Sequence, residues 1–191
     1  MGSDPKRSQT WWYIAQSGGI VAWALAPLAV IGGLQLSTRL VSKPAPAWVL
    51  DLHRFLGGLS VSFVVVHLIG LAADPFIGYG AADLLVPFAS SYRPSAVALG
   101  IIGMYLLFAI EITSLAMRRL PRSTWRAIHF TSYVVFVVAT VHGLTAGTDR
   151  NNRVYQVASA LTAGVVLMMT LVRVWSPRWA ARASTPSAGG G

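Results

Sequence analysis

The chain contains no cysteine and very little acidic charge. Without thiols, it can hold no disulfide, cysteine-ligated iron–sulfur cluster, zinc–thiolate site or thiol nucleophile. Only 11% of its 191 residues are charged, six of them acidic, whereas a soluble domain averages about 25% charged residues. A water-soluble globule of this size could not cover its surface with so few charges. Together with 54% hydrophobic residues, this composition indicates an integral membrane protein.

The net charge of +9 does not indicate a nucleic-acid-binding protein. Lys and Arg stand at the ends of long apolar runs, where membrane topology places them, and form no basic stripe interleaved with aromatic residues. We therefore expect the lipid bilayer as the immediate surrounding of the chain, and no nucleic acid partner.

Five stretches are long and apolar enough to cross a bilayer, which takes about 20 residues. The expected fold is an all-α membrane protein, a bundle of five transmembrane helices. The first span lies within residues 12–37, and the others cover approximately 47–73, 94–117, 125–148 and 154–172. We expect three segments along the chain: a flexible N-terminus at 1–10, a transmembrane helical domain at 11–175 and a disordered C-terminal tail at 176–191.

The distribution of basic residues predicts the orientation of the bundle. The loop between the third and fourth spans carries Arg118, Arg119, Arg122 and Arg126. With alternating spans, ten basic residues fall on that side of the membrane and five on the other. We expect the N-terminus outside and the C-terminus in the cytoplasm, in a bacterial inner (plasma) membrane.

All four histidines lie in two of the predicted spans, His53 and His67 in the second, His129 and His142 in the fourth. Their spacings correspond to about 21 Å and about 20 Å along a helix. Because both spans run in the same direction, His53 is expected level with His129, and His67 level with His142. Two facing imidazoles at one depth can ligate the iron of a planar macrocycle at both axial positions. The pattern predicts two stacked haems between the second and fourth helices, and electron transfer across the membrane.

Ionisable residues in a membrane have other uses. A lone histidine is more often a hydrogen-bonding group between helices, and a proton relay would recruit more carboxylates than Glu111, the one acid well inside a span. Two alternatives stay open. The first is a membrane anchor subunit of a reductase complex, with or without haem, and the second, less favoured, is a transporter or proton channel.

The histidine spacing in the fourth span does not fit a regular helix. On a regular helix, two side chains fourteen residues apart point within about 40° of each other, whereas two side chains thirteen residues apart differ in direction by about 140°. We expect either a bulge or an unwound end near one of these histidines, or haems that meet the helix from different angles.

The histidine spacing resembles that of the ferric-reductase-like transmembrane domain, a superfamily that includes NADPH oxidases, ferric reductases and the haem-binding membrane partner of bacterial methionine-sulfoxide reductase. The resemblance covers roughly residues 47–148, and the first and fifth spans look like generic helices. It implies that His53 and His129 ligate a b-type haem on the cytoplasmic side, and His67 and His142 an outer one. Its motifs are DLHRFLGGLSVSFVVVH at 51–67, LLVPFASSYRP at 84–94 and WRAIHFTSYVVFVVATVHG at 125–143.

The chain departs from this family pattern in having five helices in place of six and no flavin or nicotinamide domain after the fifth span. We therefore expect an oxidoreductase component that takes electrons from a separate donor, a quinol or a flavoprotein. The acceptor would be ferric iron or a partner redox protein.

Three arginines are candidates for binding the anionic haem propionates. Arg126 lies one turn before His129, Arg54 is adjacent to His53, and Arg93 is on the outer side. Each could equally set the topology or snorkel to the interface. Trp125 is expected to be an interfacial anchor.

Overall fold

The computed structural model describes residues 5–38, 46–147 and 151–183, and within them the chain is helical. Five of its helical stretches are long and apolar enough to span a membrane, at Gln9–Ser37, Ala47–Ala73, Pro94–Leu115, Arg122–Ala146 and Arg153–Trp175. The predicted all-α fold with five candidate spans is confirmed. The helices are α1 (Pro5–Thr38), α2 (Ala47–Ala73), α3 (Ala81–Leu85), α4 (Pro94–Leu115), α5 (Arg122–Phe130), α6 (Ser132–Ala146) and α7 (Arg153–Ala183).

The two outer helices are longer than predicted. Helix α1 begins at Pro5 and α7 ends at Ala183, so both extend into terminal segments for which flexible chain was expected. Residues 1–4 and 184–191 lie outside the described residues, as do Arg39, Lys43 and Arg150, which entered the prediction of orientation.

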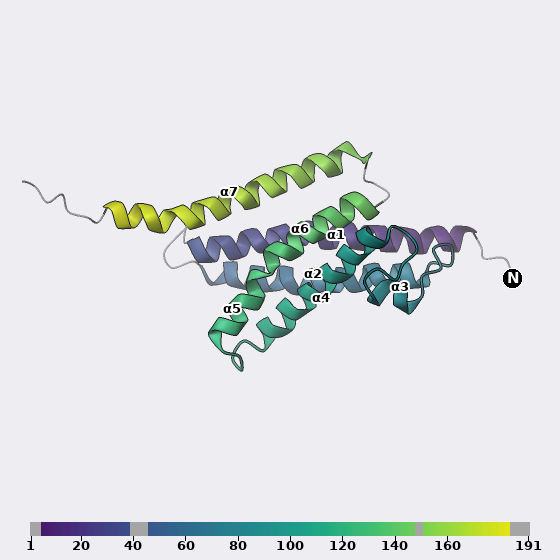
Figure 1. The fold of residues 1–191 in the computed structure, drawn as a ribbon, viewed down its shortest axis with the longest axis horizontal. Helices are drawn as coiled ribbons and strands as arrows, with labels where there is room; N and C mark the ends of the chain where they lie inside the picture. Colours follow the sequence, from purple (N-terminus) through teal and green to yellow (C-terminus); the bar gives the residue numbers. More distant parts are fainter. Residues whose placement is uncertain (1–4, 39–45, 148–150, 184–191) are drawn as a thin grey trace, which may run out of the picture.

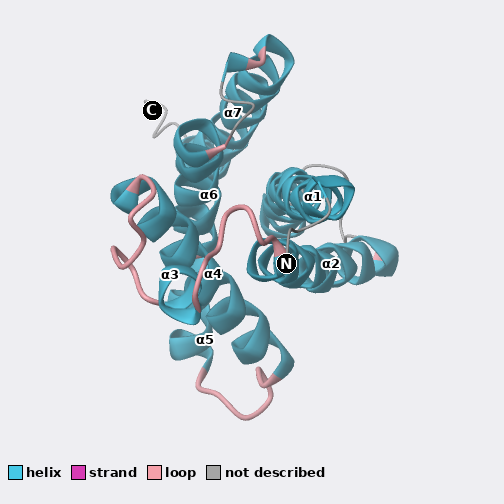
Figure 2. Cartoon of the chain, turned by 90° about the vertical axis from the view of Figure 1, so that its right-hand side faces the viewer, coloured by secondary structure: helices cyan, strands magenta, loops and turns pink. Residues whose placement is uncertain are grey.

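The helices form two packed pairs, α1 with α2 and α4 with α6 (Figure 1). Seen along the bundle, α1 and α2 lie side by side on one side, and α4, α5 and α6 on the other (Figure 2). Helix α1 also contacts α6 and α7, whereas α2 contacts α4 only sparingly. Small residues bring α1 and α2 close together, since a Cβ on Gly70 would lie 2.5 Å from the backbone nitrogen of Ala15.

A small apolar core joins α1 to α6 and α7, made of Val30, Leu34, Phe136 and Val166. Many other large apolar side chains are exposed, among them Phe55 on α2 and Ile112 on α4, at 62% and 64%. In a membrane these side chains meet lipid tails, so their exposure carries no hydrophobic cost.

The fourth span is interrupted at Thr131, which separates α5 from α6. The Thr131 hydroxyl donates a hydrogen bond to the Ile128 carbonyl at 2.6 Å, and its backbone N–H donates to the same oxygen at 3.0 Å. Such short-range bonds compete with the regular i to i+4 pattern of a helix. The irregularity expected between His129 and His142 therefore exists, and it lies two residues after His129.

The segment between α2 and α4 packs at one end of the bundle. The Tyr105 hydroxyl of α4 donates to the Leu85 carbonyl at 2.8 Å, which satisfies a backbone acceptor at the end of α3. Leu85, Val86 and Phe88 are exposed. Burial raises the pKa of the Tyr79 phenol above its usual value, against the smaller opposing effect of a hydrogen bond with Ser90.

Candidate functional site

Two histidines on different spans meet at one end of the bundle. The ring centroids of His53 on α2 and His129 on α5 are 5.8 Å apart, with 70° between the ring planes. Metal–imidazole bonds are about 2 Å long, so two rings on one metal have centroids roughly 6 Å apart once the ring radii are added. We refer to His53 and His129 as the inner pair, after the expected cytoplasmic side.

The other two histidines, His67 on α2 and His142 on α6, form the outer pair. Their levels are linked through α1 and α6, because Trp23, one turn from the Gly19 that lies against His67, donates a hydrogen bond to Thr140, two residues before His142. The structure thus brings His53 and His129 into contact, whereas His67 and His142 stay predicted partners at the other level.

Three of the four imidazoles are held by backbone carbonyl groups of a neighbouring helix. Nδ1 of His53 lies 2.9 Å from the carbonyl oxygen of Ala29, and Nδ1 of His67 lies 2.6 Å from that of Ala15. Nδ1 of His142 lies 2.8 Å from the oxygen of Ala96 on α4. A carbonyl only accepts, so Nδ1 is the protonated nitrogen in each ring and Nε2 keeps its lone pair. This is the tautomer that a metal-binding histidine needs.

These three imidazoles also lie against glycines. A Cβ built on Gly19 would be 2.9 Å from Nδ1 of His67, and one on Gly100 would be 2.6 Å from Cε1 of His142. For Gly33 the nearest imidazole atom of His53 is at 3.3 Å. Because α1 provides both the acceptors and the glycines for the histidines of α2, the interpretation of the first span as a generic helix is wrong.

His129 is held differently from the other three. Its Nδ1 lies 3.5 Å from the Ser114 hydroxyl of α4, a long contact, and the ring stacks on Trp125 at 4.9 Å between centroids and 24° between planes. The indole Nε1 of Trp125 is buried and has no hydrogen-bond partner in the described part of the chain. An orphaned buried donor beside the inner pair fits an anionic or acceptor group of a bound molecule. Sequence reasoning assigned Trp125 only to the interface, because stacking on His129 depends on the local turn of α5.

Glu111 approaches the inner pair from α4. Its carboxylate packs on α2, since a Cβ on Gly57 would lie 3.0 Å from Oε2 and one on Gly58 would lie 3.8 Å from Oε1. Gly57 lies one turn after His53 on α2, so the carboxyl group lies beside the inner pair. The inner pair therefore has polar side chains beside it as well as the Ala29 carbonyl, whereas both outer histidines meet helix carbonyls.

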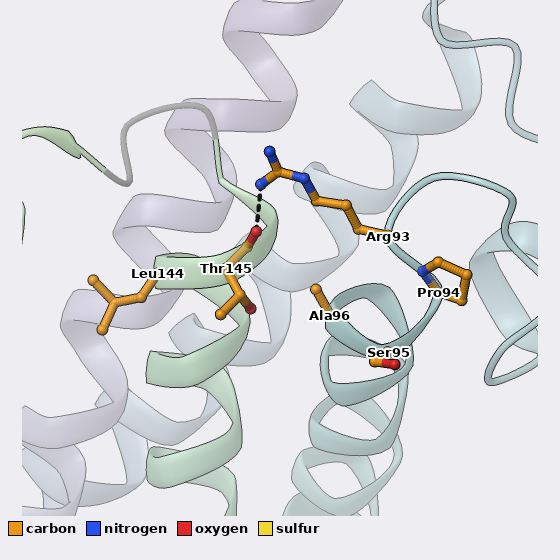
Figure 3. A pocket seen from close by; sticks show the side chains of 6 residues that line it. All are labelled: Arg93, Pro94, Ser95, Ala96, Leu144 and Thr145. Atoms are coloured by element: carbon orange, nitrogen blue, oxygen red, sulfur yellow. Dashed lines mark hydrogen bonds between the residues drawn. The ribbon is translucent and has the colours of Figure 1, made fainter.

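The predicted propionate-binding arginines occupy unequal positions. Arg93 is half-buried at the start of α4 and reaches across to α6, where its guanidinium donates to the Thr145 carbonyl (Figure 3). The two residues border an open pocket of about 400 Å³, which Ala96 also lines, and the Ala96 carbonyl holds His142. Arg93 is thus on the outer-pair side of the bundle, as expected. Arg54 and Arg126 are exposed.

The histidine pairs suit a metal ion that receives most of its ligands from a cofactor. The described residues contain no cluster of three or more His, Asp or Glu side chains that could hold a bare metal ion. A haem iron takes four ligands from the macrocycle and needs only two from the protein, which is the number that each histidine pair provides. Bis-histidine haem ligation therefore agrees with the pairs, their tautomers and the glycine contacts.

Comparisons with known proteins agree with this chemistry. Searches of curated proteins and of solved structures give no match. A family model described as "Ferric reductase like transmembrane component" matches residues 18–140, which include α1 from Gly18 onward, all of α2 and α4, and most of the fourth span. The chain therefore belongs to the ferric reductase-like transmembrane component family.

Proposed function

We propose that the chain carries electrons across the membrane by means of two b-type haems, one held by His53 and His129 and the other by His67 and His142. The proposal is carried by the contact between His53 and His129 and by the three imidazoles whose Nδ1 atoms face helix carbonyls, which leaves Nε2 of those three free as a ligand. Haem, when bound, supplies one-electron chemistry, because its iron alternates between the ferric and ferrous states.

The protein's own residues position these groups. Each histidine pair would provide two ligands to a bound haem, so the substrate would not ligate the iron and electrons would leave by outer-sphere transfer. The two histidines of α2 are separated by about 21 Å along the helix, which places one pair near each face of the membrane.

Electrons enter from a separate donor, a quinol or a flavoprotein, and pass to an acceptor such as ferric iron or a partner redox protein. We place the N-terminus outside and the C-terminus in the cytoplasm, on the asymmetry of Lys and Arg. Arg93 would contact an outer haem propionate, and Arg54 and Arg126 the inner ones, which are expected at the cytoplasmic end.

Histidine variants test the pairing directly. We expect the purified His67→Ala and His142→Ala proteins to lack the same haem in reduced-minus-oxidised spectra. The His53→Ala and His129→Ala proteins should both lack the other haem. The proposal would be overturned if the four variants each lost a different fraction of the bound haem, or if the wild-type protein had no Soret band.

Electron flow separates a conduit from an anchor subunit. Protein reconstituted in liposomes with a reductant inside should reduce an external ferric chelate, and the His53→Ala protein should not. If both haems are bound and become reduced but no chelate reduction occurs with any soluble or quinol donor, the chain is an anchor whose haems are structural.

A further inference from the structure

Helix α1 contains one five-residue pattern twice. The segments A-Q-S-G-G at 15–19 and A-V-I-G-G at 29–33 begin 14 positions apart, the same separation as His53 and His67. Because α1 and α2 run antiparallel, the first segment meets His67 and the second meets His53. The repeat on one helix is therefore in register with the histidine pair on the next.

Both segments hold their histidine in the same way. The alanine carbonyl accepts the imidazole N–H, and the last glycine, one turn later, lies against the ring. In an α-helix the carbonyl of residue i already accepts the backbone N–H of residue i+4. The imidazole therefore has to approach the alanine carbonyl past residue i+4, which here is the last glycine. A side chain on Gly19 would occupy this approach.

Helix α4 contains the arrangement once more, at Ala96 and Gly100. The Ala96 carbonyl accepts from His142, and the space beside Gly100 is the tightest of the three, with His142 atoms 2.6 and 2.7 Å from a built Cβ. Three independent positions thus combine an Ala acceptor at i with Gly at i+4.

We propose that these Ala-x-x-x-Gly segments are seats that orient the haem-ligating histidines, with Gly19, Gly33 and Gly100 as positioning residues. The proposal rests on the proposed function, since the seats matter only if the imidazoles bind metal. Each seat fixes the ring plane and the tautomer, and the donated N–H makes Nε2 a stronger base towards the metal.

The part of α4 that faces the remaining histidine, His129, has no seat. Fourteen positions beyond Ala96 and Gly100, α4 carries Ile110 and Ser114. The Ile110 carbonyl accepts a hydrogen bond from the Thr113 hydroxyl at 3.1 Å, and the Ser114 side chain stands where the seat would have glycine. His129 accordingly contacts the hydroxyl of Ser114 at 3.5 Å and no carbonyl.

Glycine-to-alanine variants of the full chain test the seats. The matched control is Gly164→Ala on α7, because a Cβ there meets no atom within 4 Å. The measurements are haem per chain, a potentiometric titration that resolves the two haems, and low-spin EPR spectra. Removing an outer-sphere partner typically weakens a metal site 10- to 100-fold.

We expect Gly19→Ala and Gly100→Ala to lose the outer haem or to shift its potential and EPR signal, with the inner haem unchanged. Gly33→Ala should act on the inner haem and more weakly, because its Cβ would lie 3.3 Å from the ring. Gly164→Ala should match the wild type. The unaffected haem in each variant reports that the protein is folded.

The outcomes distinguish the two proposals. A wild-type protein that binds no haem overturns the proposed function. A wild-type protein with two haems, together with seat variants indistinguishable from Gly164→Ala, overturns the seats alone. If Gly100→Ala and Gly19→Ala yield no folded protein, Gly33→Ala decides, and an unchanged inner haem in that variant overturns the seats.

Discussion

The inner and outer histidine pairs are built differently. Both outer histidines donate to helix carbonyls, at 2.6 and 2.8 Å, whereas in the inner pair only His53 does so. His129 depends on a long contact with Ser114 and on the stacked ring of Trp125. Backbone acceptors belong to rigid helices, and side-chain partners can move or be exchanged. The comparison indicates a uniformly held outer site and an inner site that side chains can adjust.

Among substitutions of the side chains around the inner pair, Trp125→Leu should have the largest effect. This substitution removes the ring stacked on His129 and the buried indole donor, which together are worth about 1–3 kcal/mol. We expect the inner haem to bind roughly 10-fold or more weakly, and the outer haem to stay. The control is Trp175→Leu on α7, an exposed tryptophan. Equal haem content in both variants would contradict a role for Trp125.

A smaller effect is expected from Glu111→Gln, which removes an ionisable group packed on Gly57, one turn from His53, and keeps the shape of the side chain. A nearby negative charge stabilises ferric over ferrous iron by roughly 1 kcal/mol, or about 40 mV for one electron. The inner potential should therefore rise in a redox titration and the outer one should not change. A fall in the inner potential, or an equal rise of both, would refute this assignment.

The smallest effect is expected from Ser114→Ala, which removes the hydroxyl next to His129. A contact as long as 3.5 Å contributes at most about 0.5–1 kcal/mol. We expect a slightly broadened inner low-spin EPR signal without loss of haem. Ser114→Gly sharpens the comparison, since it offers His129 the glycine that the seats contain. A loss of haem from Ser114→Ala as large as from Gly100→Ala would erase the distinction between the pairs.

The spans and the histidine partners could be predicted because they depend on hydropathy and on helical rise alone. The spacing of 13 is compatible with an interruption near one histidine or with haems that meet the helix from different angles. The sequence does not choose between them, because the interruption depends on how the Thr131 hydroxyl competes with the backbone. The part of α1 in the site was missed for a physical reason. Small residues spaced along a membrane helix usually mean close helix packing, and their match to the histidine spacing becomes meaningful only once α1 is placed beside α2.

The central claim is that each of the two depths holds one bis-histidine haem, and the number of haems per chain tests it most directly. A pyridine haemochrome assay with quantitative amino-acid analysis of the purified wild-type protein measures that ratio. The proposed function predicts two haems per chain, both low-spin and six-coordinate. A ratio below one, or high-spin iron at both sites, would contradict it.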